Sequence, residues 1–517
     1  MNDDHDEDLP EQTRVRLEKV ARLRELGVDP YTPRAARTHT IGELREQFDQ
    51  LLPAPVTAPS GAGGGDDRDG NTEAEPAPMV TIAGRLVSRR DMGKASFGHL
   101  RDGTGDFQLF LRRDALGEEP YARFRGLIDL NDFLEATGTP IVTRTGEPTL
   151  EVREYRLLTK ALTPPPDKWR GLTDVETRYR QRYVDLLVNE ESRRVFVTRT
   201  RLVAALRRHL DAQGFLEVET PTLQPLYGGA AARPFTTYYH ALDQTFYLRI
   251  ADELYLKRLI VGGFEKVYEI CKDFRNEGID ARHSPEFTQL ELYQAYADYQ
   301  DIMRLVEGML HAIALEVNGH PRLTYAGKTV DLTPPWRRLP MREAILEYSG
   351  VDYAAHPEQR ALYEAARAAG AEVAPDTVWP RLVDELFKTF VVRNIVEPTF
   401  IYDYPTALSP LAKQQPGDPD TVERFQPIVA GLELGNAYSE LNDPQEQLAR
   451  FREQARDRAA GDEEAMPIDE DYVAALRYGM PPTGGLGIGI DRLAMLFTDQ
   501  RTIRDVILFP ALRNDTA

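Results

Sequence analysis

The sequence predicts an α+β protein in which a small β-barrel precedes a larger mixed domain built around an antiparallel sheet. A chain of 517 residues is too long for one ordinary hydrophobic core. Residues 79–162 show several short strand patterns separated by glycine turns. Residues 186–515 instead alternate helical and strand-like stretches. At least two domains of different architecture are therefore expected.

Composition is that of a soluble globular protein. Cys271 is the only cysteine, which excludes an internal disulfide and any multi-cysteine zinc site and fits a reducing compartment. The N-terminus is acidic where a targeting signal would be basic, and no apolar run is long enough to span a bilayer. We expect a cytoplasmic protein with no membrane partner. The net charge of −20 argues only weakly against nucleic acid, because a local basic groove can coexist with it.

The N-terminal 52 residues read as a helical element. Val15, Val20, Leu23 and Leu26 recur at helical spacing before Gly27 ends the helix. Residues 53–78 contain many Gly, Pro and Asp and almost no large apolar side chains. Such a segment buries too little surface to order itself, so it is predicted to be a low-complexity, flexible insertion.

The short strands of residues 79–162 favour a five-stranded OB-fold barrel. Barrels of this kind often bind single-stranded nucleic acid on a face that carries aromatic and basic residues. Phe97, with Arg89, Arg90 and Gln108, would supply that chemistry. Equally, Phe97 could be a core aromatic and the arginines a solvated surface. Residues 163–185, which begin with "TPPPDKWRGL", are expected to be a stiff linker.

The stretch "FRNEGIDARHSPEFTQLELY", residues 274–293, places many charges between aromatic residues. In a strand, alternation puts Phe287, Gln289, Glu291 and Tyr293 on one face and Thr288, Leu290 and Leu292 on the other. A hairpin with the preceding strand would gather Arg275, Glu277, Phe287 and Glu291, with His283 on the connecting loop. A surface hairpin of ion pairs, each worth ~0–1 kcal/mol, is the alternative, but it does not explain the interleaved aromatic residues.

The stretch "GGLGIGIDRLAMLF" carries glycine at positions 485, 487 and 489. These residues would leave one strand face bare, against which a flat ring could lie, while Leu486, Ile488 and Ile490 pack the other face. Asp491 is expected to cap the next helix, and Arg492 in its first turn would meet an anion or a ring. Tight packing of neighbouring elements is the alternative explanation for the glycines.

The stretch "LELGNAYSELND" places Asn436, Tyr438 and Glu440 on one face, with Glu433 just before them. Carboxylates without a nearby Lys or Arg in the sequence indicate a divalent cation or a cationic ligand. Solvated surface acids remain the alternative.

Together these segments resemble the three signature motifs of class II aminoacyl-tRNA synthetases. "GFLEVETP", residues 214–221, resembles the first motif, "FRNEG" followed by "RHSPEFT" the second, and "GLGIGIDRLAML" the third. From "LRELGVDPY" to "TIRDVILFP", the chain resembles the bacterial-type lysyl-tRNA synthetases of subclass IIb, with only the segment around residues 53–78 outside the similarity.

The resemblance implies a class II antiparallel-sheet catalytic domain, which forms a dimer through the region around residues 214–221. It implies ATP- and Mg²⁺-dependent ligation of lysine to tRNA(Lys). The implied catalytic residues are Arg275 and Arg492. The implied ATP-binding residues are Arg275, Glu277, His283, Phe287, Glu433 and Arg492. The implied lysine-binding residues are Gly229, Glu253, Glu291, Tyr293, Asn436, Tyr438 and Glu440. Magnesium would be held by Glu433 and Glu440, and the anticodon by Arg90, Phe97, Gln108 and Glu147.

Two positions depart from the family pattern. Gln426 stands where many members have an acid that helps to bind an additional magnesium, and Ser284 replaces a common asparagine. Ligases for aspartate or asparagine are an alternative within the class, but Glu253 and Glu291 would repel aspartate. A paralogue that lysylates a protein would lack the barrel. A catalytically silent RNA-binding protein would not need Arg275, Glu277, Phe287, Glu440 and Arg492.

Overall fold

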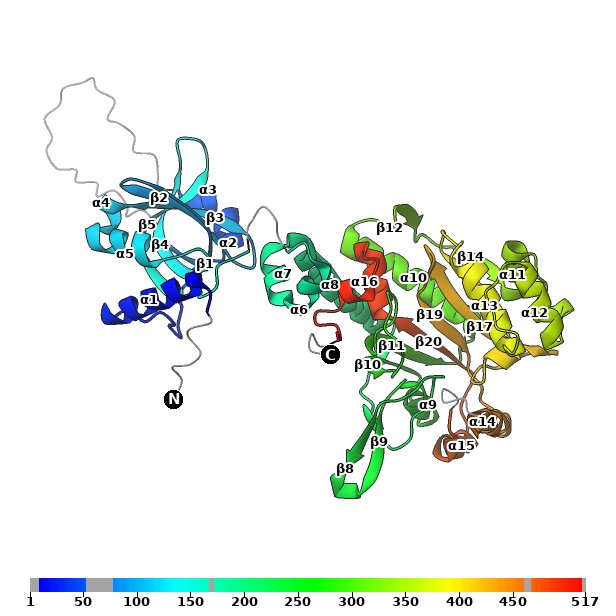
Figure 1. The fold of residues 1–517 in the computed structure, drawn as a ribbon. Coiled ribbons are helices and arrows are strands. Elements are labelled where there is room, and N and C mark those ends of the chain that lie inside the picture. The colour runs from blue at the N-terminus through cyan, green and yellow to red at the C-terminus, as the bar shows by residue number, and fades with distance from the viewer. Residues whose placement is uncertain (1–8, 53–77, 167–171, 460–465, 514–517) are drawn as a thin grey trace, which may run out of the picture. The chain divides into compact units, whose positions relative to one another are not determined.

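The computed structural model describes residues 9–52, 78–166, 172–459 and 466–513 (Figure 1). The chain separates into two compact units, residues 1–171 and 172–517. The expected insertion lies outside the described residues, apart from Pro78. Residues 172–185 of the expected linker belong to the second unit, where Arg182 is buried and donates to the carbonyl of Leu508 at 3.0 Å.

The first unit contains the predicted five-stranded closed barrel, with strand order β1-β2-β3-β5-β4. Buried and part-exposed side chains alternate along β2 and β3, as expected for strands with one face toward a core. The strands are β1 (Val80–Met92), β2 (Ala95–Arg101), β3 (Asp106–Arg112), β4 (Phe133–Val142) and β5 (Pro148–Thr159).

Among the described residues of this unit, the helices that accompany the barrel are α1 (Glu11–Glu25), α2 (Ile41–Glu46), α3 (Phe48–Leu51), α4 (Arg113–Leu116) and α5 (Glu118–Leu127). The last two were not predicted. Leu23, Ile41 and Phe48 share one core with the barrel. Val15 and Leu26, expected on the apolar side of the first helix, are exposed, because α1 instead buries Thr13, Arg16, Val20 and Leu23.

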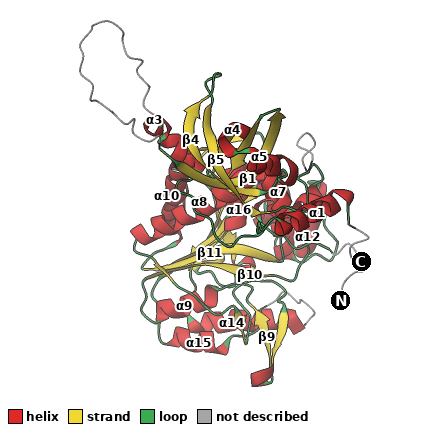
Figure 2. Cartoon of the chain, turned by 90° about the vertical axis from the view of Figure 1, so that its left-hand side faces the viewer, coloured by secondary structure: helices red, strands yellow, loops and turns green. Residues whose placement is uncertain are grey.

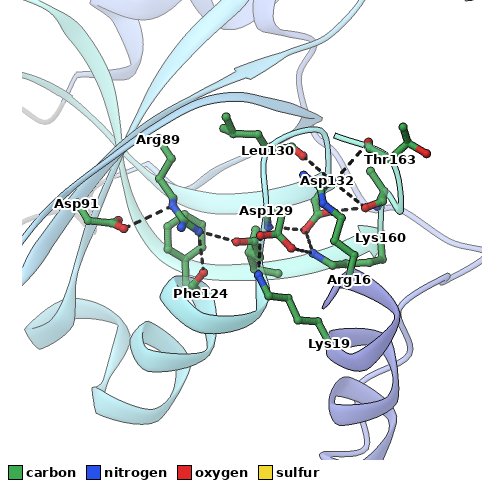
Figure 3. A network of polar contacts seen from close by, with 12 residues as sticks. Arg16, Lys19, Arg89, Asp91, Phe124, Asp129, Leu130, Asp132, Lys160 and Thr163 are labelled. Atoms are coloured by element: carbon green, nitrogen blue, oxygen red, sulfur yellow. Dashed lines mark hydrogen bonds and ion pairs between the residues drawn. The ribbon is translucent and has the colours of Figure 1, made fainter. Parts of the chain in front are cut away.

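A buried polar network holds α1 against the barrel (Figure 3). The side chain of Lys160 is inaccessible, and its Nζ lies 2.5 Å from Asp129 Oδ2 and 2.7 Å from Asp132 Oδ2. Lys19 reaches the other oxygen of Asp129 at 2.6 Å, and Arg16 donates to the carbonyl of Ala161 at 2.8 Å. This network fixes the N-terminal helix to the segment that leaves the barrel.

The second unit is built on a ten-stranded sheet with main order β14-β15-β17-β19-β20-β11-β10-β6. All pairs are antiparallel except β14 with β15 and β6 with β10, which confirms the predicted α+β class. Its strands are β6 (Leu216–Glu217), β10 (Lys266–Phe274), β11 (Glu286–Ala295), β14 (Arg337–Pro340), β15 (Thr399–Pro405), β16 (Gln414–Gln415), β17 (Asp418–Val429), β18 (Leu432–Glu433), β19 (Gly435–Ser439) and β20 (Thr483–Gly489). Two small sheets are formed by β7 (Leu223–Gln224), β8 (Thr236–Tyr239) and β9 (Gln244–Leu248), and by β12 (Arg322–Tyr325) and β13 (Lys328–Asp331).

Helices cover both faces of the sheet around β10 and β11 (Figure 2). Leu290 and Leu292 face the core that includes α8, α10 and α16, whereas Tyr293 faces the core that includes α9 and α15. The helices are α6 (Val175–Arg180), α7 (Arg182–Val188), α8 (Glu190–Ala212), α9 (Glu253–Val261), α10 (Tyr299–Asn318), α11 (Met341–Ser349), α12 (Gln359–Ala368), α13 (Trp379–Leu386), α14 (Pro444–Ala459), α15 (Glu470–Arg477), α16 (Ile490–Thr498) and α17 (Ile503–Val506). The sequence alternation in residues 287–293 thus separates the two cores correctly.

Candidate active site

A cavity of about 400 Å³ opens in the second unit, between β11, β19, β20 and the first turns of α9 and α16. Most of the predicted catalytic-domain residues line it. They are Gly229, Glu253, Arg275, Glu277, His283, Phe287, Glu433, Asn436, Tyr438 and Arg492. Glu291, Tyr293 and Glu440 are absent from the lining and lie buried behind it.

One end of the cavity is cationic and aromatic. Arg275 follows β10 directly, and its guanidinium carbon lies 5.0 Å from the centroid of the Phe287 ring on β11. Arg492 in the first turn of α16 donates to the carbonyl of Glu433 at 2.8 Å, and its Nη2 lies 3.4 Å from His283 Nε2. Two guanidinium groups and a ring therefore converge on one space, which suits a phosphorylated ligand with a flat ring.

Asp491 does not cap α16, contrary to expectation; the N-cap residue is Gly489, which has no side chain to offer. Asp491 lies within the first turn and turns toward the sheet. Its Oδ2 accepts a 2.7 Å hydrogen bond from the backbone N–H of Thr288, and Oδ1 pairs with Arg199. The carboxylate thus fixes α16, and with it Arg492, against β11.

The other end of the cavity is acidic and buried. Tyr438 donates to Glu253 Oε1 at 2.7 Å, and Tyr293 donates to Glu291 Oε2 at 2.9 Å. Burial, reinforced by the negative charge of Glu253, raises the pKa of Glu291 to about 8. This end therefore favours a cationic ligand, because a nearby positive charge would stabilise the ionised carboxylates.

Lys257, which the sequence reasoning missed, is the internal cation of this acidic end. Its Nζ lies 2.6 Å from Glu253 Oε1 and forms an ion pair with Glu440. Burial alone would lower the pKa of Lys257, but Glu253 and Glu440 outweigh it and raise the pKa. The signal was present in the sequence, because Glu253 and Lys257 stand four residues apart in a helical stretch.

The glycines of β20 make room for these acidic side chains. A Cβ atom at Gly487 would lie 2.6 Å from Glu291 Oε1, and one at Gly485 would overlap Glu440 and Tyr293. At Gly485 the bare strand face is therefore covered by protein side chains, and the expectation of a flat ring is wrong there. Gly487 and Gly489 line the cavity, where the expectation of a flat ring stays a prediction.

The implied magnesium site fits the described residues in part. Glu433 lines the cavity and is partly exposed, so its carboxylate is accessible to a cation. Its Oε1 lies 3.7 Å from Arg492 Nη1. Gln426 adds an amide oxygen that accepts a 2.9 Å hydrogen bond from Tyr404. Carboxylate and amide oxygens suit Mg²⁺. Glu440, in contrast, is buried and already paired with Lys257.

The outer face of the barrel carries the predicted nucleic-acid residues. Phe97 lies outside the core and stacks on Phe110, with ring centroids 4.6 Å apart, so the interpretation of Phe97 as a core residue is wrong. Arg90 is its partner in the ladder between β1 and β2. The hydroxyl of Thr149 donates to Gln108 Oε1 at 2.7 Å and lies 3.1 Å from the carbonyl oxygen of Glu147. A stacked aromatic pair with polar neighbours suits splayed bases.

Comparison with known proteins connects both units to one family. Residues 174–513 match the family described as tRNA synthetases class II (D, K and N), and residues 80–158 match an OB-fold nucleic acid binding domain. The chain belongs to the class II tRNA synthetases. The lysine–tRNA ligase of Roseiflexus castenholzii is 55% identical to this synthetase over 98% of the chain and 99% of the relative. Those of Chloroflexus aurantiacus and Enterococcus faecalis are 54% and 49% identical, over 96% and 98% of this chain and 97% and 99% of the relatives.

Arg424, which lines the cavity of this synthetase, is a second residue that the sequence reasoning missed. Its Nε donates to Asn436 Oδ1 at 2.7 Å, and its Nη1 donates to the carbonyl of Leu408 at 2.8 Å. Asn436 is thereby oriented with its NH₂ group available as a donor. The signal is long-range only, because pairing between β17 and β19 places Arg424 opposite Tyr438, two residues from Asn436 on the same strand. Across the described part of the synthetase, no helix has the length and apolarity needed to cross a membrane.

Proposed function

We propose that this protein activates lysine with ATP and transfers it to the 3′ end of tRNA(Lys). The observation that carries this proposal is a single cavity lined by Arg275, Phe287, Arg492 and Glu253, with Glu291 buried behind the lining. ATP supplies phosphates and a flat ring, whereas lysine supplies an ammonium group. The names of relatives that cover almost the whole chain support the same substrate.

In the first step, an oxygen of the lysine carboxylate attacks the α-phosphorus of ATP. The bond to the bridging oxygen breaks, which gives lysyl-adenylate and pyrophosphate. Arg275 would oppose the charge that develops on the α-phosphate, the kind of electrostatic stabilisation that often contributes most to catalysis. Phe287 and Arg492 would hold the adenine between them, with Glu277 and His283 as further nucleotide contacts. No side-chain nucleophile is required, because the bound reactants are positioned for direct attack.

In the second step, a terminal ribose hydroxyl of the tRNA attacks the acyl carbon of lysyl-adenylate. The ester forms, the hydroxyl proton is released and AMP leaves. Bases of the anticodon would stack on Phe97 and accept or donate hydrogen bonds at Arg90, Gln108 and Glu147.

Lysine selection follows from the buried acids. An ammonium group withdrawn from water needs opposing carboxylates. Glu291 has neutral partners and would be the main one, while Glu253 and Glu440 also face Lys257. Tyr293 and Tyr438 hold two of these acids, while Asn436 and Gly229 complete the pocket. Aspartate would be repelled at the same place.

Magnesium would be held by Glu433, with the neighbouring amide of Gln426; Glu440 is the less favourable ligand because Lys257 already compensates it. The ion supplies charge neutralisation for the phosphates of ATP. The homodimer through residues 214–221 is also part of the proposal and is compatible with the exposed side chain of Leu216 on the edge strand β6. A cytoplasmic location remains a prediction.

The decisive assay is amino-acid-dependent exchange of labelled pyrophosphate into ATP, run with each of the twenty amino acids and without tRNA. Exchange with lysine alone is expected. Exchange with aspartate or asparagine would overturn the specificity. The absence of exchange with every amino acid, together with retained tRNA binding in a filter assay, would favour a silent RNA-binding protein.

A further inference from the structure

A compact group of potential metal ligands lies behind the substrate cavity. One ligand atom from each of Asp252, Glu269 and Cys271 can be chosen so that all three lie within 4.8 Å of one another, and all three residues are buried. None of them lines the cavity. Glu269 and Cys271 alternate along β10 and share a sheet face, whereas Asp252 immediately precedes α9.

Within this group, Asp252 is the residue that the described structure leaves without hydrogen-bond partners, whereas the thiol of Cys271 lies 3.7 Å from its acceptor, Asp273 Oδ1. Neither carboxylate oxygen of Asp252 has a hydrogen-bond partner among the described residues, although the side chain is completely buried. Asp273, two residues after Cys271 on the same face, is also completely buried, and its Oδ2 is likewise without a hydrogen-bond partner in the described structure. An unsatisfied buried carboxylate is costly and requires an explanation.

Positive charge near the group is limited. Arg249 is the neighbouring buried cation: it lies 2.7 Å from Glu269 Oε1 and 3.4 Å from Asp273 Oδ1. Thr220 satisfies the second oxygen of Glu269 through its hydroxyl at 2.7 Å. One guanidinium therefore pairs with Glu269 and Asp273, and no ion pair of Asp252 or Cys271 is found among the residues that the structure describes.

We infer that Asp252, Glu269 and Cys271 bind a divalent transition-metal ion, with Zn²⁺ as the ion that fits this donor set. Zinc accepts thiolate and carboxylate ligands together, and three protein ligands are enough for a site completed by water or by Asp273. Ligands about 2.0–2.3 Å from a tetrahedral zinc lie roughly 3.3–3.8 Å apart, so the three ligand atoms, which lie within 4.8 Å of one another, need to approach by at most about 1.5 Å.

The position of the group suggests a structural role for the ion. Glu269 stands opposite Glu291 in the ladder between β10 and β11, and Asp252 directly precedes Glu253 in the chain. The ion would link the start of α9 to β10. Glu253 is the first residue of α9, and Arg275 directly follows β10. Because the ligands are buried, the metal would enter during folding and exchange slowly.

The test is metal analysis of the full-length protein, expressed in zinc-supplemented medium, purified without a metal-affinity tag and desalted without nucleotide. We expect close to one zinc ion per chain, as for a structural site. Cys271→Ser and Asp252→Asn should each reduce the zinc content to background. Thr220→Val, which removes a partner of Glu269 and no ligand, and Glu433→Gln, at the separate magnesium candidate, should keep it.

Growth in cobalt-supplemented medium gives a second readout that does not depend on the variants folding. Cobalt bound to a thiolate shows sulfur-to-metal charge-transfer absorption, which we expect in the wild-type protein. Wild-type protein that carries neither zinc nor cobalt would overturn the proposal and leave protonated carboxyl groups as the explanation. Equal metal content in the wild type and Cys271→Ser, or cobalt without the charge-transfer band, would overturn it as well.

Discussion

The hydroxyl of Tyr438 donates a 2.7 Å hydrogen bond to Glu253 Oε1 across a sequence separation of 185 residues. The same oxygen lies 2.6 Å from Lys257 Nζ, so the charge of Glu253 is already compensated inside the protein. Glu291 differs, because its partners Tyr293 and Gln289 are both neutral. Of these two carboxylates, Glu291 therefore has the greater need of a substrate cation.

Lysine use should depend on pH through Glu291. Burial and Glu253 raise the pKa of this carboxyl to about 8, so it is mostly protonated at pH 7 and must lose its proton to face an ammonium group. We expect kcat/KM for lysine in pyrophosphate exchange to fall by up to about tenfold per pH unit below pH 8.

The matched variant for this pH profile is Glu291→Gln. Loss of a charge-assisted contact should raise KM for lysine roughly 10- to 150-fold and flatten the profile. Glu286→Gln, on the exposed end of the same strand, should leave KM for lysine and the pH profile unchanged. An equal pH slope in the wild type and Glu291→Gln would assign the titration to another group.

Lys257→Met should strongly destabilise the second unit. The substitution leaves Glu253 and Glu440 buried without a cation, which typically costs ~3–5 kcal/mol in the free energy of unfolding. Urea unfolding measures this cost. Lys388→Met breaks a partly exposed pair with Asp384 and should cost only ~0–1 kcal/mol. An equal loss of unfolding free energy in the two variants would show that the buried ion pairs of Lys257 stabilise the protein no more than an exposed pair does.

Arg275→Ala should act on the rate of adenylation. Removing a group that opposes transition-state charge is expected to lower kcat roughly 10²- to 10³-fold, with KM for lysine little changed. Stopped-flow or exchange kinetics can separate the two constants. Arg304→Ala, an exposed arginine on α10 that pairs with Asp301, is the control and should retain wild-type kinetics. A rise in KM alone would place Arg275 in lysine binding instead.

Gly487→Ala should weaken lysine binding while the fold persists. The new Cβ would lie 2.6 Å from Glu291 Oε1 and 2.9 Å from Gln289 Nε2, and both side chains can move away. Overpacking costs roughly 1–3 kcal/mol, which corresponds to a rise in KM for lysine from several-fold to about a hundredfold. Gly308→Ala has open space around its Cβ and should be neutral or stabilising. An unchanged KM for lysine in Gly487→Ala would show that the missing side chain at Gly487 is not needed to place Glu291 for lysine binding.

Phe97→Leu should separate the two steps of the reaction. Pyrophosphate exchange without tRNA should be unchanged, because the substitution lies in the barrel. Loss of a stacked base costs ~1–3 kcal/mol, so KM for tRNA in aminoacylation should rise roughly 5- to 150-fold. Phe97→Tyr keeps an aromatic ring, so its KM for tRNA should stay close to the wild-type value. Equal KM values for tRNA in Phe97→Leu and Phe97→Tyr would show that base stacking does not explain the effect.

Much of the fold was predictable because its signals are local. Alternation along residues 287–293 placed Leu290 and Leu292 in one core and Tyr293 in the other, as observed. Short strands with glycine turns indicated the barrel. The helices α4 and α5, the exposure of Val15 and the position of Asp491 were missed, because each depends on which neighbour the element packs against.

The sequence by itself determined the class of the protein, the order of its two units and most residues around the cavity. Periodicity and motif spacing carry that information along the chain. Only the tertiary structure decided how the acids are balanced. Lys257 compensates Glu253 and Glu440, neutral partners surround Glu291, and Asp252 is buried without a partner among the described residues. These differences arise from burial and from contacts between distant segments, and the free energy of a charge depends on both.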